Sequence, residues 1–179
     1  MFGTAVFLFV APPLAIDFRA VKTRVRLGEA VVFRAEARNV GKRAIRFVLQ
    51  GDSAQFGTKS PLIQFEVRPA GGTWRLPCEV GCGNSNPAVP KDFVSIGPGA
   101  SVDVLNGMVW SQGPLMLGLG SKGTYDVRLT IDTTAPIERW LGGPLIPEEA
   151  AKAKAALQSL YDEVPKSRWV SKAVRIVVE

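Results

Sequence analysis

Few side chains in this sequence are of the types that usually carry out catalysis. The 179 residues include no histidine and only two cysteines. Without histidine the sequence has no Ser-His-Asp or Cys-His nucleophile system, no histidine-ligated metal centre and no histidine-based pH switch. The chemistry that remains open depends on the carboxylates, the serines and the two cysteines.

The carboxylates and serines do not form a recognisable catalytic set. Asp126 and Asp132 lie on the same face of a predicted strand, but at the usual rise per residue they are about 20 Å apart, whereas glycoside hydrolysis needs two carboxylates about 5–10 Å apart. Asp52, Asp92 and Asp103 stand in predicted turns, and the sequence has no GxSxG, SxxK or DxDxDG motif. We therefore predict a protein that is not an enzyme and that uses no cofactor or metal ion.

The two cysteines, Cys78 and Cys82, lie in the sequence PCEVGCG, a loop indicated by its proline and glycines. A zinc site needs two further Cys or His ligands, which the sequence does not supply, and a thioredoxin-type motif has two intervening residues rather than three. We expect a disulfide between Cys78 and Cys82, which requires the turn to bring their Cα atoms within about 7 Å. A disulfide favours an oxidising compartment.

The first fifteen residues, MFGTAVFLFVAPPLA, are apolar and uncharged. Residues 5–11 resemble the core of a signal peptide, although no basic residue precedes them, and the run is shorter than the about 20 residues of a spanning helix. We expect 1–15 to be a cleaved or degenerate export signal, with an anchor or a buried first strand as the alternatives. If the segment is retained, Phe7 and Phe9 are candidate partner contacts. The expected location is periplasmic or extracellular, with or without membrane association.

The net charge of +6 is unevenly distributed. Residues 1–50 contain nine basic and three acidic residues, whereas the remaining 129 residues contain 13 of each. The basic residues are interpreted first as solvent-facing positions of strands, and the alternative is a surface that meets an acidic partner or an anionic membrane. No nucleic-acid partner is expected, because the sequence has no helix-turn-helix, zinc-finger or RNP pattern.

Most of the sequence alternates between apolar and polar residues, which is typical of antiparallel strands with one buried face. The clearest examples are residues 30–40, 45–49, 63–68, 125–132 and 174–178, separated by Gly- and Pro-containing turns. Residues 147–164 instead show helical spacing, with a proline and acidic residues at the start and Pro165 after the end. We predict a helix here that caps the sheets or, alternatively, binds a partner.

The alternation also predicts which large side chains are buried. The expected core residues are Phe33, Phe47, Phe65, Tyr125, Leu129 and Ile176. Tyr125 is further expected to donate its hydroxyl to a neighbouring backbone group.

The segment before the predicted helix is more apolar than a solvated loop requires. Ile137, Trp140, Leu141 and Leu145 lie close together in it. We therefore expect them to be exposed and to contact a partner.

Four short motifs follow one another along the sequence. They are Arg26-Leu27-Gly28-Glu29 before a strand ending in Asn39-Val40-Gly41, Asp92-Phe93 with Pro98-Gly99, Gly123-Thr124-Tyr125, and the tail from Trp169 to Ile176. The order of these motifs resembles that of bacterial exported immunoglobulin-like domains. The resemblance covers residues 16–179 and implies an all-β, immunoglobulin-like antiparallel β-sandwich with one helical insertion before the last strand. The helix, the cysteine loop and Lys172 in place of an asparagine depart from the pattern. Proteinase inhibitors of the BsuPI type show a weaker similarity.

From these features we expect a non-catalytic binding or structural accessory protein. It would dock on a larger extracytoplasmic or membrane-associated assembly through strand edges, the loop 134–146 and the apolar N-terminus. Two alternatives remain open at this point. One is a proteinase inhibitor that presents the loop 77–90, and the other is a carbohydrate-binding module that uses exposed tryptophans.

Overall fold

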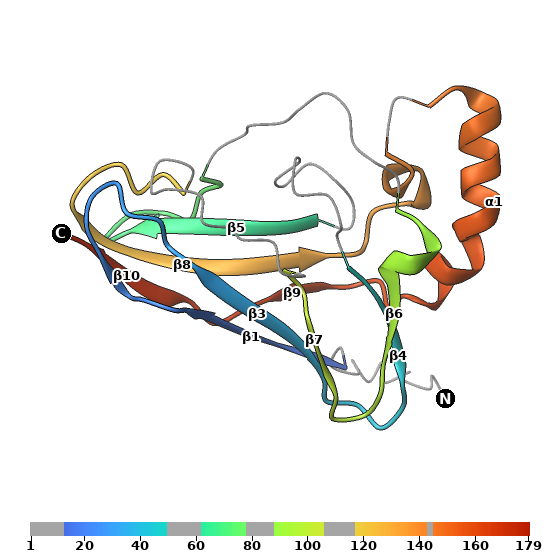
Figure 1. Ribbon diagram of the computed structural model, residues 1–179, viewed down its shortest axis with the longest axis horizontal. Helices are drawn as coiled ribbons and strands as arrows, with labels where there is room; N and C mark the ends of the chain where they lie inside the picture. The colour runs from blue at the N-terminus through green and yellow to red at the C-terminus, as the bar shows by residue number, and fades with distance from the viewer. Residues whose placement is uncertain (1–12, 50–61, 78–87, 106–116, 143–144) are drawn as a thin grey trace, which may run out of the picture.

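The computed structural model describes residues 13–49, 62–77, 88–105, 117–142 and 145–179 (Figure 1). Its strands are β1 (Leu14–Ala20), β2 (Arg24–Val25), β3 (Phe33–Asn39), β4 (Ile45–Val48), β5 (Leu62–Pro69), β6 (Phe93–Ile96), β7 (Ser101–Asp103), β8 (Gly123–Asp132), β9 (Arg168–Val170) and β10 (Val174–Val178). Two short 3-10 helices, η1 (Pro90–Asp92) and η2 (Ile137–Trp140), precede the α-helix α1 (Pro147–Glu163). The prediction of a mostly β protein with one helix is confirmed.

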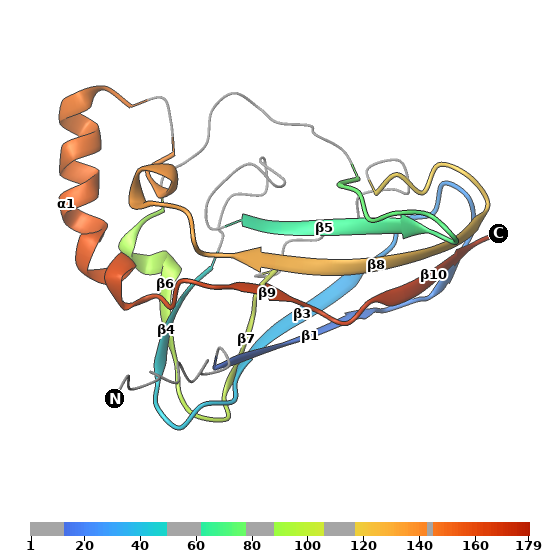
Figure 2. The same cartoon turned by 180° about the vertical axis from the view of Figure 1, so that it is seen from behind.

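The strands form two principal sheets. The first has the order β1-β3-β7, and the second has the order β2-β10-β8-β5, with β9 also paired to β8. The strand pairs are antiparallel except for β2 with β10. Strands β4 and β6 pair separately in a two-stranded sheet, and a turn joins each of them to a strand of the β3–β7 pair. The two principal sheets lie as two layers, and α1 stands at one end of them (Figure 1, Figure 2).

Alternation along the strands builds the main core between the two sheets. Three aromatic rings meet there, with centroids 5.0 Å apart for Phe18 and Phe33, 5.7 Å for Phe18 and Phe65, and 5.3 Å for Phe33 and Phe65. The predicted core residues Phe33, Phe47, Phe65, Tyr125, Leu129 and Ile176 are all buried, as expected. The Tyr125 hydroxyl donates to the backbone oxygen of Ser121 at 2.9 Å, which confirms the predicted tyrosine contact.

Asn39 holds the two turns at the end of β3 together. Its buried side-chain nitrogen donates to the backbone oxygens of Arg43 and Ile96, each at 2.8 Å, and its side-chain oxygen accepts from the backbone N–H of Gly41 at 2.9 Å. Arg43 lies just before β4 and Ile96 is the last residue of β6. This single side chain therefore connects the turn between β3 and β4 to the turn between β6 and β7.

The helix matches the predicted range 147–164 to within one residue. Its apolar side packs on η1, η2 and β4. A second core forms there from Val48, Ala88, Phe93, Ile137, Trp140, Leu141, Leu157 and Val164. The helix therefore caps its own chain, as the first of the two interpretations predicted. Two strands, β9 and β10, follow the helix, so the expectation that it precedes only the last strand is corrected.

The first described strand begins before the predicted boundary at residue 15. Leu14 is the first residue of β1, is only 6% exposed and packs in the main core. The carbonyl oxygen of Pro13 accepts a hydrogen bond from the backbone N–H of Val40 at 2.8 Å. Residues 13–15 are thus part of the folded unit, whereas Phe7 and Phe9 lie outside the described residues.

Candidate functional site

The apolar segment before the helix is not an exposed contact surface. Ile137 and Leu141 are each 5% exposed, and Trp140 is fully buried between Phe93 and Tyr161, with ring centroids at 6.2 and 4.9 Å. The expectation that these residues are exposed is therefore wrong. Their apolar surface is covered because α1, which begins only a few residues later in the sequence, packs against it.

The other predicted contacts have varied positions. Leu145 is half-buried and packs against the same second core. Cys78 and Cys82 lie outside the described residues, so their disulfide stays a prediction. Among the tryptophans Trp169 is buried, Trp74 is half-buried and Trp110 lies outside the described residues.

The basic residues of the first fifty positions are spread over several parts of the fold. Four of them have acidic partners: Arg19 pairs with Asp17 and Glu36, Lys22 with Glu29, Arg24 with Glu179, and Arg46 with Glu163. Such exposed pairs contribute little stability. They do, however, neutralise part of the positive charge that the sequence concentrates in this segment.

A different group of charged residues gathers on the outer face of the second sheet. The strand register places Arg68 of β5 beside Asp126 of β8, and Asp126 beside Arg175 of β10. Two residues away on the same pair of strands, Glu66 of β5 lies beside Arg128 of β8. We call these five residues the outer-face cluster. They lie on the polar side of their alternating strands, as their sequence pattern predicts.

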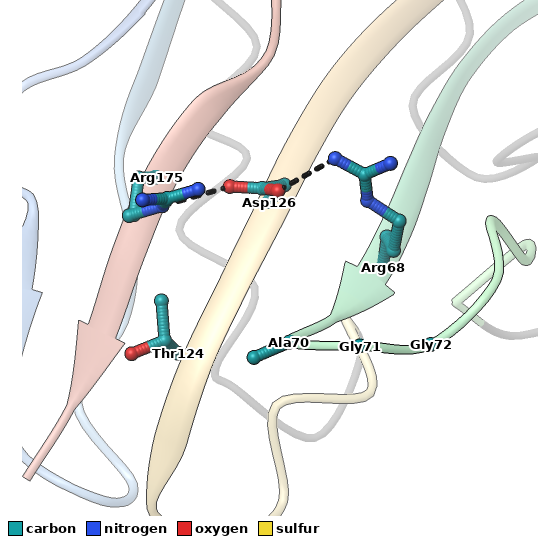
Figure 3. Close-up of a pocket in the computed structure, with 7 residues that line it drawn as sticks. All are labelled: Arg68, Ala70, Gly71, Gly72, Thr124, Asp126 and Arg175. Atoms are coloured by element: carbon teal, nitrogen blue, oxygen red, sulfur yellow. Dashed lines mark hydrogen bonds and ion pairs between the residues drawn. The ribbon is translucent and has the colours of Figure 1, made fainter.

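Asp126 is the centre of the first half of this cluster. Its carboxylate accepts a hydrogen bond from Nη2 of Arg68 at 2.8 Å and one from Nε of Arg175 at 3.1 Å (Figure 3). Its side chain is only 15% exposed, whereas that of Arg175 is 70% exposed. The hydrogen bonds from Arg68 and Arg175 lower the pKa of Asp126. The carboxylate is thus held ionised between two guanidinium groups.

Glu66 occupies the same role in the second half. It accepts hydrogen bonds from Nε of Arg128 at 2.6 Å and from the hydroxyl of Thr130 at 3.0 Å, and Nη2 of Arg168 lies 3.4 Å away. Burial on its own raises the pKa of Glu66, but the hydrogen bonds from Arg128 and Thr130, with the charges of Arg128 and Arg168, lower it overall. Both carboxylates of the cluster therefore serve as fixed anions.

The Trp74 ring contacts two arginines of the outer-face cluster. After β5 the chain turns back at residues 70–72 and pairs Arg75 with Val67, which brings Trp74 onto the outer face. The guanidinium carbon of Arg128 lies 4.1 Å from the centre of the Trp74 ring, and that of Arg68 lies 4.6 Å from it. Cation–π contacts of this kind favour guanidinium orientations in which the group lies over the ring.

An open hollow of about 520 Å³ adjoins the first half of the cluster. Arg68, Asp126 and Arg175 form one side of it, and Thr124 and the turn 70–72 form the other (Figure 3). The lining has two positive side chains and one negative side chain. A second hollow of about 540 Å³, over β1 and β3, is lined by two acidic and two basic side chains and is balanced.

The sequence contained part of the signal for this site. Period-two alternation placed Glu66, Arg68, Asp126 and Arg128 on polar faces, but Arg68 and Arg175 lie on different strands, far from Asp126 along the chain. Trp74 had no distinguishing pattern at all. The site was missed because its members meet only through strand register.

Two kinds of feature are absent from the described residues. No group of three or more Cys, Asp or Glu residues in the described ranges is arranged to hold a metal ion. None of the described helices is long and apolar enough to cross a membrane.

No protein-family model matches this sequence, and no curated protein matches it significantly.

Proposed function

We propose that this protein is a non-catalytic binding protein, an accessory subunit that docks on a partner protein through the outer face of the β10-β8-β5 sheet. The observation that carries the proposal is the convergence of Arg68 and Arg175 on one carboxylate beside an open hollow. Two guanidinium groups on one carboxylate leave a surplus positive charge with N–H donors that face solvent. Arginine and tryptophan are also the residue types enriched at the energetic centres of protein interfaces.

The state of the carboxylates supports a binding role over a catalytic one. A general acid at neutral pH needs a raised pKa, whereas the pKa values of Glu66 and Asp126 are both lowered. Each carboxylate is also already engaged by two arginines, which makes it a poor general base or nucleophile.

We further propose that the fold is an immunoglobulin-like sandwich and that the protein is exported, with a periplasmic or extracellular location. The two facing sheets and the hydrogen bond from the Tyr125 hydroxyl to the backbone four residues upstream support the fold. The apolar N-terminal run and the closely spaced cysteines support the location.

The two alternatives have less support. Of the three tryptophans that the structure describes, Trp140 and Trp169 are buried and Trp74 is contacted by two guanidinium groups, so these three rings are not free for sugar stacking. The inhibitor alternative depends on the loop 77–90, most of which lies outside the described residues.

Site-specific photo-crosslinking tests the proposed face. Val170 lies on β9 beside the cluster and is 43% exposed, and Val32, which precedes β3 of the other sheet, is 39% exposed. A photo-reactive residue at either position leaves every charged side chain in place, so the two form a matched pair. We expect a specific adduct with a partner protein in the native cell from position 170 and not from position 32. Adducts from position 32 alone, or from neither position, would contradict the proposal.

A further inference from the structure

We propose that the hollow beside Asp126 binds a single carboxylate, supplied by a glutamate or aspartate side chain of the partner, with Arg68 and Arg175 as its donors. This inference rests on the proposed function and specifies what the docking face recognises.

The two guanidinium groups are held in place without being saturated. Each arginine has five N–H donors, and each uses one of them on Asp126: Nη2 of Arg68 at 2.8 Å and Nε of Arg175 at 3.1 Å. Arg68 is additionally held by the Trp74 ring. A donor that is already oriented loses little conformational entropy when a ligand binds. Arginine forks are well suited to carboxylates, which they bind through two parallel hydrogen bonds.

The charge of the hollow selects the kind of anion. Arg68 and Arg175 contribute two positive charges and Asp126 contributes one negative charge, so the lining has a surplus of one. A carboxylate neutralises this surplus. A phosphate dianion would instead leave one uncompensated negative charge close to Asp126, which is unfavourable in a partly desolvated site.

The opposite side of the hollow offers polar groups and no obstruction. The backbone N–H of Ala70 donates to Thr124 and that of Gly72 donates to Pro69, and no hydrogen bond within the described residues engages the N–H of Gly71. Gly71 has a φ of +73°, a left-handed conformation that side chains disfavour. A glycine suits this turn, and Gly71 lines the hollow together with Thr124.

The occupant we favour is a protein side chain rather than an acidic sugar. Sugar recognition commonly uses the open face of an aromatic ring beside the polar groups. The nearby Trp74 ring is instead contacted by Arg68 and Arg128, at 4.6 and 4.1 Å.

Nuclear magnetic resonance titration of the full chain tests the inference with defined probes. The probes are the peptide Ac-Gly-Glu-Gly-NH2 and its uncharged counterpart Ac-Gly-Gln-Gly-NH2, followed by glucuronate and inorganic phosphate at neutral pH. We expect the glutamate peptide to shift the amide resonances of Gly71, Gly72 and Thr124 with saturation. The glutamine peptide should bind at least about tenfold more weakly, because it lacks the charge that strengthens the hydrogen bonds.

Matched arginine variants locate the site. Arg175→Gln removes a side chain that is 70% exposed, so the domain should keep its spectrum while the glutamate peptide loses at least about tenfold in affinity. Arg34→Gln, on the outer face of the other sheet, should leave the affinity unchanged. Equal binding of the two peptides, unchanged binding by Arg175→Gln, or tighter binding of glucuronate or phosphate than of the glutamate peptide would each overturn the inference.

The two proposals fail separately. If position 170 crosslinks to a partner but the glutamate peptide does not bind the hollow, the docking face stands and the carboxylate inference is wrong. If the peptide binds but position 170 gives no adduct in the cell, the anion site stands and the docking proposal is wrong.

Discussion

Replacing Trp140 by alanine tests whether the apolar segment before α1 is core or contact surface. Trp140 is fully buried, and its ring meets Tyr161 edge to face at a centroid distance of 4.9 Å. Truncating a buried tryptophan costs about 3–5 kcal/mol, including the cavity that it leaves. Trp140→Ala should therefore lower the free energy of unfolding by about that amount, a large share of the total stability of a domain, typically about 5–15 kcal/mol.

A second variant makes the test more specific. No hydrogen bond within the described residues satisfies the buried indole N–H of Trp140, and an unsatisfied buried donor costs about 1–3 kcal/mol. Trp140→Phe loses packing volume but also removes this donor, so it should cost less than half as much as Trp140→Ala.

Urea denaturation followed by circular dichroism measures both variants, with Ile146→Ala as the control. Ile146 lies at the start of α1 but is 59% exposed, so its truncation should change stability by no more than about 0.5 kcal/mol. A loss below about 1 kcal/mol for Trp140→Ala, with an unchanged denaturant slope, would refute its placement in the core.

Three further predictions follow from other parts of the fold. Asn39→Asp should lower the free energy of unfolding by at least about 3 kcal/mol at neutral pH, because a buried carboxylate would face two carbonyl oxygens. Denaturation at pH 4 should show a smaller loss of stability, and equal losses at both pH values would contradict this. Deleting residues 1–15 should lower the free energy of unfolding by about 2–4 kcal/mol, because it removes buried Leu14 and the hydrogen bond to Pro13. Deleting 1–12 retains both contacts. Equal stability of the two truncated chains would show that β1 does not need its first residues. Burial lowers the pKa of Lys166 to about 8, so between about pH 8 and 10.5 the unfolded chain binds more protons than the folded chain and stability should rise with pH. Lys166→Met should lack this rise, and identical pH profiles for the two proteins would refute the shift.

The main core could be predicted from the sequence because its signal is local. In a strand, successive side chains point to opposite faces, so alternation alone identified Phe33, Phe65 and Ile176 as buried and Arg68 and Asp126 as outward-facing. The helix was predicted equally well, because its start and stop residues are also local.

The sequence misled where an apolar run is covered by the helix that follows it. Ile137, Trp140 and Leu141 have the composition of an exposed contact surface, and nothing in their spacing shows that α1 folds back onto them. Burial of an apolar loop is decided by packing, which depends on where the following helix is placed and not on the loop itself.

The amino-acid sequence by itself determined the strands, the helix, the face on which each strand residue lies and the surplus of positive charge. Only the tertiary structure decided which charges meet. Asp126 lies 58 residues from Arg68 and 49 residues from Arg175 along the chain, and these three residues become neighbours solely through the register of β8 with β5 and β10. A slip of one residue in either pairing would send the side chains of one strand to the opposite face, so the candidate site depends on strand register, a non-local property that alternation within a single strand does not specify.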